Sequence, residues 1–230
     1  MSARNNRQAA GVAAESAGSA PLSKERVVAE AMRLADREGV DGLSMRRLAG
    51  ELGAGAMSLY HYVANKDDLL DAMIDVVFSE IDLPDLQQDW RTAMRSRALS
   101  ARRVLTAHPW AISQMEARTT PGPANLRHRE AVIACLRGAG FSVVMATHAN
   151  WMLDSYLYGH VLQEVGLPFD TVEEFSQAAE EVYLPQLPPA QFPFLAASAT
   201  ELLASGYDPA QEFGYGLDLI LDALEARRVA

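Results

Sequence analysis

The sequence of 230 residues contains one cysteine, Cys135, and two lysines, Lys24 and Lys66. A single cysteine excludes a disulfide within the chain, and we expect a protein of the reducing cytoplasm. No arginine-led apolar leader and no apolar run long enough to cross a bilayer is present, so neither export nor a membrane partner is expected. His-Glu-x-x-His, Gly-x-Ser-x-Gly and paired cysteines are also missing, and we therefore expect no catalytic residues.

The acidic charge of the chain is distributed unevenly. The net charge is −10, but residues 1–66 hold nine Lys and Arg against seven Asp and Glu, a net charge of +2. Residues 67–230 carry the remaining −12. The first part can be basic on one side, because Arg46, Arg47 and Lys66 cluster around one motif, while the acidic remainder should stay away from phosphate.

Residues 43–66 predict two short helices joined by a glycine turn, which is the arrangement of a helix-turn-helix DNA reader. Ser44 can cap the first helix, and Gly53 can end it in a left-handed conformation. The apolar residues of this helix recur at helical spacing, which puts Arg46 and Arg47 outward. These apolar residues are Met45, Leu48, Ala49 and Leu52.

The second helix is predicted to enter the major groove. Leu59 and Val63 should face inward, which by the helical step turns the other side chains outward or to the flanks. Such a helix would meet base edges with its outer face and the sugar-phosphate backbone with its flanks. The outward residues are Met57, Ser58 and His61, and the flanking residues are Tyr60 and Tyr62.

Individual roles follow from side-chain chemistry. Arg46, Ser58 and His61 can hydrogen-bond to bases, whereas Tyr60 and Lys66 suit phosphate. The alternatives are that Lys66 merely begins the next helix and that Tyr60 is a half-buried aromatic. The predicted DNA-binding residues are Arg46, Met57, Ser58, Tyr60, His61, Tyr62 and Lys66.

The rest of the chain is also predicted to be largely helical. A helix over 23–38, ended by Gly39, would complete a three-helix core with the motif. Asn65 can cap a helix that runs to Ile81, with Asp68 in a capping box. Further helices are predicted over 90–107, 110–116, 124–138, 143–165, which is the longest, and 209–225, which Asp208 would cap.

These elements predict an all-α fold of two domains. Residues 21–66 would form the helix-turn-helix DNA-binding domain, and residues 67–230 a larger helical domain for ligand binding and dimerisation. Residues 1–20 lack apolar periodicity and are expected to be a disordered tail. Residues 170–190 are expected to hold the longest irregular stretch.

The motifs along residues 22–81 occur in a characteristic order. They are Gly-x-x-Gly-Leu-Ser-x-Arg, Leu-Ala-x-x-Leu-Gly, Leu-Tyr-x-x-Val and Asn-Lys-x-x-Leu. This stretch resembles the tetracycline-repressor (TetR) family of bacterial regulators. Residues 212–225 are more faintly similar to the last helix of the tetracycline-repressor type of C-terminal domain.

The resemblance implies a homodimer that binds a palindromic operator in double-stranded DNA. It further implies a repressor that is released when a small-molecule effector enters the C-terminal domain. Two recognition helices must then enter successive major grooves about 34–36 Å apart, and the helix over 66–81 is the covalent lever between the domains. In tetracycline repressors a histidine after the fifth helix helps to hold a magnesium chelate. Residues 112–116 contain none, so we expect an apolar or aromatic effector without a metal or other cofactor.

Large, adaptable side chains between residues 90 and 195 could line an effector cavity. For any one of them, packing in the core is an open alternative. The predicted ligand-binding residues are Met94, Trp110, Met115, His148, Trp151, Met152, Tyr156 and Phe194.

The last helix carries an apolar stripe that could form a dimer interface. Two copies of it and of the 143–165 helix could pack as a four-helix bundle, with Gly214 and Gly216 allowing close approach. The alternative is that the stripe packs within its own subunit. The predicted dimerisation residues are Phe213, Leu217, Ile220, Leu221 and Leu224.

Two other functions stay open at this point. One is a constitutive DNA-binding dimer without an effector. The other is a helical metal-dependent enzyme, in which His160 and Glu164 would share a metal on one helix face.

Overall fold

The computed structural model describes residues 21–117, 120–169 and 171–228. Every element within these ranges is helical, which confirms the predicted all-α fold. The tail predicted over residues 1–20 lies outside the described residues. None of the described helices combines the length and apolar character needed to span a bilayer.

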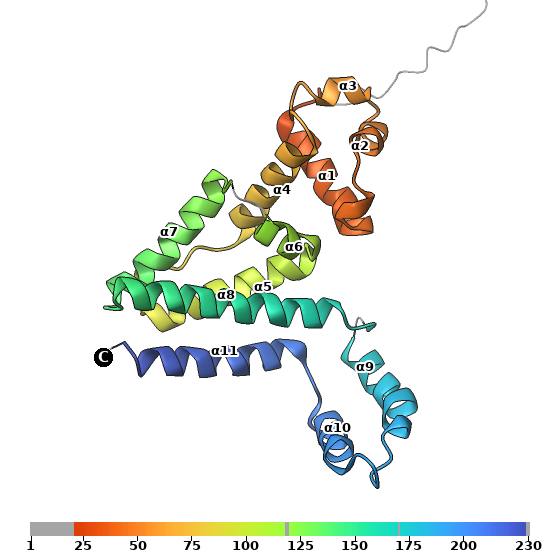
Figure 1. Cartoon of the computed structure of the whole chain (residues 1–230), viewed down its shortest axis with the longest axis vertical. Coiled ribbons are helices and arrows are strands. Elements are labelled where there is room, and N and C mark those ends of the chain that lie inside the picture. The colour runs from red at the N-terminus through yellow and green to blue at the C-terminus, as the bar shows by residue number, and fades with distance from the viewer. Residues whose placement is uncertain (1–20, 118–119, 170, 229–230) are drawn as a thin grey trace, which may run out of the picture.

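A small helical head lies at one end of the molecule, and a larger body and a projecting arm make up the rest (Figure 1). The head contains α1 (Lys24–Glu38), the 3₁₀ turn η1 (Val40–Gly42), α2 (Met45–Glu51) and α3 (Ala56–Leu59), and α4 (Lys66–Glu80) runs from it into the body. The body contains α5 (Trp90–Ala107), α6 (Trp110–Ala117), α7 (Pro123–Gly138), α8 (Val143–Val165) and α11 (Pro209–Glu225). The arm contains α9 (Val172–Ala178), the π-helical turn η2 (Ala179–Tyr183), the 3₁₀ turn η3 (Leu184–Gln186) and α10 (Pro193–Ser205).

α1 and α2 begin and end where the sequence predicts. The Ser23 and Ser44 hydroxyls each accept a hydrogen bond from the amide three residues further on, at 3.2 and 3.3 Å. Gly53 follows α2 with a φ of 64°, and the amide of Ala54 donates to the carbonyl of Ala49 at 2.9 Å. This is the Schellman arrangement, in which a left-handed glycine lets the last carbonyls of a helix find donors.

α3, the predicted recognition helix, is shorter than expected: it ends at Leu59 after one turn, and residues 60–62 form a turn. Gly55 precedes it and offers no side-chain acceptor for its first amides. The Tyr-His-Tyr sequence that follows consists of weak helix formers. Leu59 and Val63 nevertheless point inward as predicted, and both are buried.

α4 begins at the predicted cap. The Asn65 side chain accepts a hydrogen bond from the Asp68 amide at 2.8 Å, and the Asp68 carboxylate accepts one from the amide of Ala64 at 2.9 Å. The returning bond therefore reaches one residue before the cap, where a standard capping box would use the cap residue itself. Two acidic residues in the first turn of α4 also lie at the positive end of its dipole, where negative charge stabilises the helix.

The N-terminus of α7 is capped by a residue of α4. The Asp75 carboxylate accepts hydrogen bonds from the amides of Ala124 and Asn125, at 2.7 and 3.1 Å. Gly122 precedes α7, and a Cβ atom there would lie 2.3 Å from the same Asp75 oxygen. The two helices are therefore joined by a cap that the sequence did not predict.

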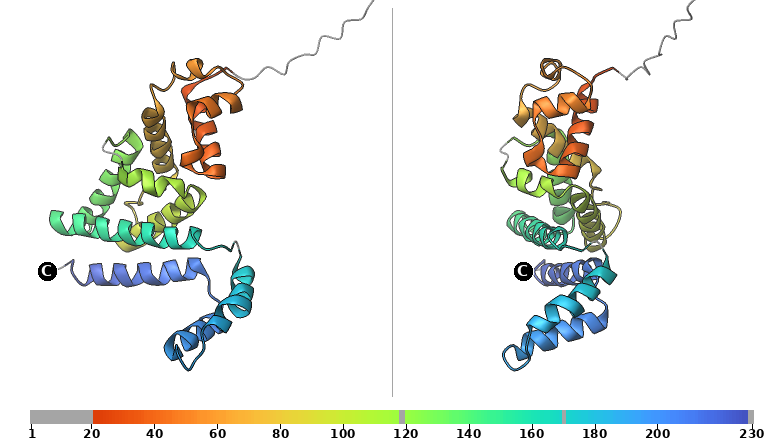
Figure 2. Two further views of the ribbon diagram at one scale, coloured as in Figure 1. Left: turned by 45° about the vertical axis from the view of Figure 1, so that its right-hand side comes forward. Right: turned by 90° about the vertical axis from the view of Figure 1, so that its right-hand side faces the viewer.

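α8 is the longest described helix, as predicted, and lies alongside α11 (Figures 1 and 2). The Ser142 hydroxyl caps it by accepting from the Met145 amide at 3.1 Å. Gly140 follows α7 with a φ of 96° and forms a second Schellman arrangement. In it, the Phe141 amide donates to the backbone carbonyl of Leu136 at 3.2 Å. The buried Phe141 then directs the chain into α8.

The arm differs from the prediction, because helical turns occupy most of the segment over 170–190 that was expected to be irregular. α10 was not predicted and follows the prolines at 188 and 189. It begins with Pro193 in its first turn and has no side-chain cap. The arm projects from the layer formed by α8 and α11 (Figure 2).

Candidate DNA interface and effector domain

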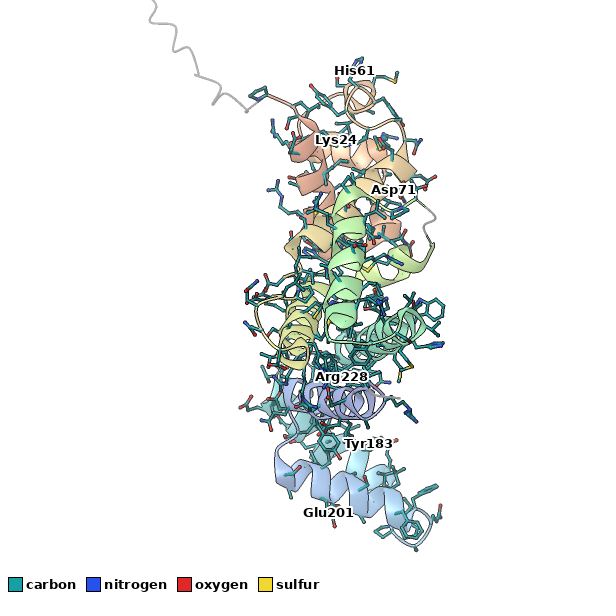
Figure 3. All side chains as sticks on the ribbon, turned by 90° about the vertical axis from the view of Figure 1, so that its left-hand side faces the viewer. Lys24, His61, Asp71, Tyr183, Glu201 and Arg228 are labelled. Carbon is teal, nitrogen blue, oxygen red and sulfur yellow. The ribbon has the colours of Figure 1, made fainter. Side chains whose placement is uncertain are left out.

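The tip of the head exposes the side chains that were predicted to face DNA. Met57, Ser58 and His61 are exposed, and His61 lies at the outermost end of the head (Figure 3). Tyr60 is also exposed, while Tyr62 is half-buried against the core of the head. This placement satisfies the steric condition for groove binding, and the DNA contacts themselves stay predictions.

The cations near the motif differ in their partners. Arg47 forms an ion pair with Glu38 at 2.5 Å, whereas Arg46 is exposed and has no ion-pair partner among the described residues. The Lys66 ammonium is exposed and donates to the backbone carbonyl of Val40 at 3.4 Å. Arg46 is therefore the arginine of this pair whose donors are available to DNA.

A side-chain cluster ties the head directly to the body. The Asp36 carboxylate, near the end of α1, accepts a hydrogen bond from the Trp110 indole at 2.7 Å. The same oxygen lies 2.7 Å from Nδ1 of His108, whose Nε2 lies 3.1 Å from the Glu80 carboxylate. Besides the covalent lever α4, the head therefore has a polar contact with the corner between α5 and α6, which the sequence did not predict.

Several of the predicted ligand-binding residues belong to the core. Met94 is fully buried, and Trp110 is buried with its indole bonded to Asp36. The Tyr156 hydroxyl donates to the backbone carbonyl of Phe213 at 2.9 Å, and its ring stacks on the Phe213 ring. For these three residues the structure favours the alternative of core packing, because each side chain already has protein neighbours on its apolar surface.

The other predicted ligand-binding residues lie mostly outside. Trp151, Met152 and His148 are exposed on α8, and Phe194 is 89% exposed on α10. These four residues were expected to line an interior cavity, but helical spacing shows only which residues share a face and not what covers that face. His148, Trp151 and Met152 border an open pocket between α8 and α11, and Met115 borders a cavity between α4, α6 and α7.

The cavity between α4, α6 and α7 has a volume of about 320 Å³. Ile74 of α4 and Met115 of α6 give it an apolar wall, and Asn125 and Arg129 of α7 give it a polar one. A molecule bound there would touch α4, which continues into the head.

A second cavity, of about 450 Å³, lies within the arm. Its walls are almost entirely apolar and include Phe169, Phe175, Val182 and Leu202. Its lining contains no residue of α4, so a ligand there would not touch the lever.

A buried polar cluster joins α5, α7 and α8 inside the body. Nε of Arg97 donates to Nε2 of His128 at 3.0 Å, and Nη2 of Arg97 donates to the Asp154 carboxylate at 2.9 Å. Arg97 and His128 are almost completely buried. Burial, followed by the nearby charges of Arg97 and Arg129, lowers the pKa of His128 to about 3. The ring is therefore neutral at physiological pH.

Sequence reasoning missed this cluster, although a signal was present. Arg97 and His128 occupy positions on the apolar faces of the helices that the sequence predicts over 90–107 and 124–138. A charged or polar residue at such a position is rare unless it is paired or functional.

The predicted dimer stripe on α11 packs mostly within its own subunit. Phe213, Leu217, Leu221 and Leu224 are buried within their own subunit, and Ile220 is partly buried against the same core. A side chain that is already covered by its own chain presents no surface to a partner. The burial of this stripe therefore favours the alternative of packing within the subunit.

The glycines of α11 serve the same internal packing. A Cβ atom at Gly216 would lie 2.4 Å from the Tyr156 hydroxyl, so this glycine makes room for α8 of the same subunit. A Cβ atom at Gly214 would lie 3.4 Å from Arg95, which forms an ion pair with Asp218 at 2.9 Å. The approach that these glycines permit is to α8 and α5 of the same chain.

Another face of the α8 and α11 pair is apolar and exposed. Trp151 and Met152 of α8 are 62% and 45% exposed, and Tyr215 and Leu219 of α11 are 66% and 53% exposed. Large exposed apolar groups on adjacent helices are typical of an interaction surface. We refer to these four residues as the α8–α11 face.

Two descriptions of known protein families match successive parts of the chain. Residues 27–73 match the family described as bacterial regulatory proteins, tetR family, and residues 83–228 match the tetracyclin repressor-like C-terminal domain. The chain belongs to the TetR family. The predicted resemblance is confirmed, and the head is the helix-turn-helix domain of a TetR-family transcriptional regulator.

TetR-family relatives and structures match most of the chain. The HTH-type transcriptional repressor DrrR1 of Streptomyces coeruleorubidus is 35% identical over 215 residues, 89% of this chain and 77% of that protein. The tetracycline repressor protein class A from transposon 1721 of Escherichia coli is 31% identical over 211 residues, 90% of this chain and 93% of that protein. The crystal structure of the Streptomyces coelicolor TetR family protein ActR in complex with actinorhodin has a TM-score of 0.75 and 31% identity, and covers 91% of this chain and 99% of ActR.

The residues of the enzyme alternative have structural partners in this TetR-family fold. Glu164 accepts a hydrogen bond from Arg102 at 2.8 Å, and Nε2 of His160 lies 3.0 Å from the Pro209 carbonyl. Because a carbonyl only accepts, His160 carries its proton on that nitrogen. Within the described ranges no group of three or more His, Cys, Asp and Glu is placed to hold a metal ion.

Proposed function

We propose that the chain is a ligand-responsive repressor that binds a palindromic operator as a homodimer and releases it when a small aromatic molecule binds the body. The observation that carries the proposal is the exposure of Met57, Ser58 and His61 at the tip of a helix-turn-helix head. Family membership supplies the regulatory context.

The proposed operator contacts divide by chemistry. Arg46, Ser58 and His61 read base edges, and Met57 makes apolar contact within the groove. Tyr60, Tyr62 and Lys66 hold the sugar-phosphate backbone and fix the register. The free guanidinium of Arg46 supports its role, because it gives up no ion pair on binding.

The α8–α11 face, rather than the buried stripe, is the proposed dimer interface. Two copies of α8 and α11 would form a four-helix bundle about a two-fold axis and cover Trp151 and Leu219. A rigid dimer is needed because the two heads must reach grooves about 34–36 Å apart.

The proposed effector site is the cavity between α4, α6 and α7. A ligand there contacts Ile74 on the lever and Met115 on α6, and it can favour one position of the head over another. The arm cavity lacks such a contact. The ActR complex with actinorhodin supports a small-molecule effector in a relative of the same fold.

DNA binding is tested by titrating the protein onto the DNA upstream of its own gene and onto a scrambled duplex, using fluorescence anisotropy. Arg46→Ala should weaken operator binding about tenfold and reduce discrimination against the scrambled duplex, because one good base contact is worth about 1–3 kcal/mol. Arg127→Ala is the control, since Arg127 is exposed on α7, away from the head. If the unmodified protein retains no duplex at low ionic strength, the proposed function is wrong.

Effector response is tested on the same complex with added tetracycline, actinorhodin and other aromatic compounds. Release of the operator by at least one compound supports a ligand-responsive repressor. Unchanged operator affinity across a broad panel would favour the alternative of a constitutive DNA-binding dimer.

A further inference from the structure

We propose that Nη1 of Arg97 and Nδ1 of His128 form an oxygen-binding subsite, and that the effector is an aromatic acid whose carboxylate binds there. Both atoms are buried and have no hydrogen-bond partner. The role of this subsite in regulation rests on the proposed function, whereas its binding preference does not.

The hydrogen bonds fix the proton of His128. A guanidinium has only donors, so the 3.0 Å contact from Nε of Arg97 requires Nε2 of His128 to accept. The neutral ring must then carry its proton on Nδ1. Nδ1 is therefore a buried donor without an acceptor, as is Nη1 of Arg97. Unpaired buried donors are unfavourable, and a ligand that supplies an acceptor oxygen relieves this.

The charges of the cluster favour an anion over a neutral acceptor. Asp154 pairs with the Nη2 side of Arg97 and leaves the Nη1 donors without an acceptor. Arg129 adds a second cation on α7, close enough to disfavour a charged His128. A carboxylate accepts from two donors at once and pairs with a guanidinium, which makes charge-assisted bonds stronger than neutral ones.

The subsite lies about one helical turn beyond the wall of the proposed effector cavity. The walls of this cavity include Ile74 of α4 and Asn125 of α7. Phe78 and His128 lie about one helical turn further along the same helices, roughly 5 Å along each axis. The rings of Phe78 and His128 pack with centroids 5.6 Å apart, so they form a layer directly beyond these wall residues.

Occupation of the subsite would alter the packing beside both α4 and α8. Phe78 belongs to the lever α4, and Asp154 belongs to α8, which carries part of the α8–α11 face. A carboxylate bound between α5 and α7 therefore changes the contacts of the lever and the dimer helix together.

The proposal is tested by isothermal titration of the full chain with anthraquinone-2-carboxylate and with its methyl ester. The acid should bind at least tenfold more tightly than the ester. His128→Phe and Arg97→Gln should abolish this preference and leave the ester affinity within about threefold. Arg127→Gln, which removes an exposed arginine from the same helix as His128, should keep the preference.

A second readout covers variants that fold poorly. Thermal unfolding identifies such variants, and ¹⁵N NMR of the histidine-labelled unmodified protein then tests the subsite without any substitution. The acid, but not the ester, should shift the Nδ1–H resonance of His128. Equal binding of acid and ester, binding of neither, or an unmoved His128 resonance would each overturn the subsite. Preference for the acid without operator release would keep the subsite and count against the proposed function.

Discussion

Burial of the His128 ring makes the folded state less stable in acid and leaves a donor, Nδ1, that has no acceptor. It is neutral because it is buried between Arg97 and the Phe78 ring, with Arg129 nearby. The unfolded chain has no such environment, and there the pKa of a histidine is close to its usual 6.5. Protonation of this residue therefore favours the unfolded state at mildly acidic pH.

We predict that acid destabilises the unmodified protein more than the His128→Phe variant. Between pH 6.5 and about 3 the unfolded state binds a proton that the folded state does not, so the free energy of unfolding falls as the pH falls. At pH 5 the loss attributable to His128 is about 2 kcal/mol relative to pH 7.5. Urea unfolding of both proteins at the two pH values measures it, and parallel losses would contradict the assigned pKa shift.

Two hydrogen bonds between helices hold α4 and the head against the body. Asp75 of α4 caps α7, and Asp36 of α1 holds Trp110 of α6. α4 is therefore joined at Asp75 to the start of α7, which borders the proposed effector cavity, and the head is joined to the corner between α5 and α6. Both contacts lie on the route by which a ligand between α4, α6 and α7 can affect the head.

Gly122→Ala should lower the free energy of unfolding by about 1–3 kcal/mol, because the added Cβ would displace Asp75 from the first amides of α7. Gly138→Ala is the control at the other end of this helix, where nothing lies within 4 Å of an added Cβ. It should be neutral or slightly stabilising. Chemical denaturation of the two variants decides, and equal effects would exclude the cross-helix cap as the cause.

The sequence predicts helix ends well where the cap is local. Ser44, Asn65 and Ser142 each bond to an amide three residues ahead, so the pattern is contained in four residues. Asp75 caps a helix that begins 48 residues later in the chain, and no local pattern contains that contact. The same reason explains why the sequence did not predict the bond from Trp110 to Asp36.

Asp36→Asn should loosen both sides of the contact between head and body. Hydrogen–deuterium exchange should rise at the end of α1 and at the start of α6 together, because Asp36 is the acceptor for Trp110 and lies against His108. Glu30→Gln is the control, since Glu30 pairs only with Arg33 on the same helix among the described ion pairs. A rise confined to α1 would show that the contact does not couple the two helices.

The placement of α11 shows what an apolar stripe leaves undecided at the scale of the molecule. Asp218 and Asp222 pair with arginines of α5 on one side of this helix, and Leu217 and Leu221 are buried in the subunit core. Tyr215 and its neighbours on the remaining side are exposed. Periodicity in the sequence correctly places the stripe on one face, but only the packing of α5, α8 and α11 determines that this face is internal.

Trp151→Glu or Leu219→Glu should convert the proposed dimer to a monomer, since either change places a charge within the α8–α11 face. Operator affinity should fall at least about a hundredfold, because a monomer presents a single head to a two-site operator. Thermal stability of the subunit should change little, as both side chains are exposed.

Phe194→Glu is the control, since Phe194 is equally apolar and more exposed but lies on α10 in the arm, and it should leave the dimer intact. Analytical ultracentrifugation measures the assembly. If Trp151→Glu and Phe194→Glu both remain dimeric, the two heads are held apart by another surface and the α8–α11 face is not the interface.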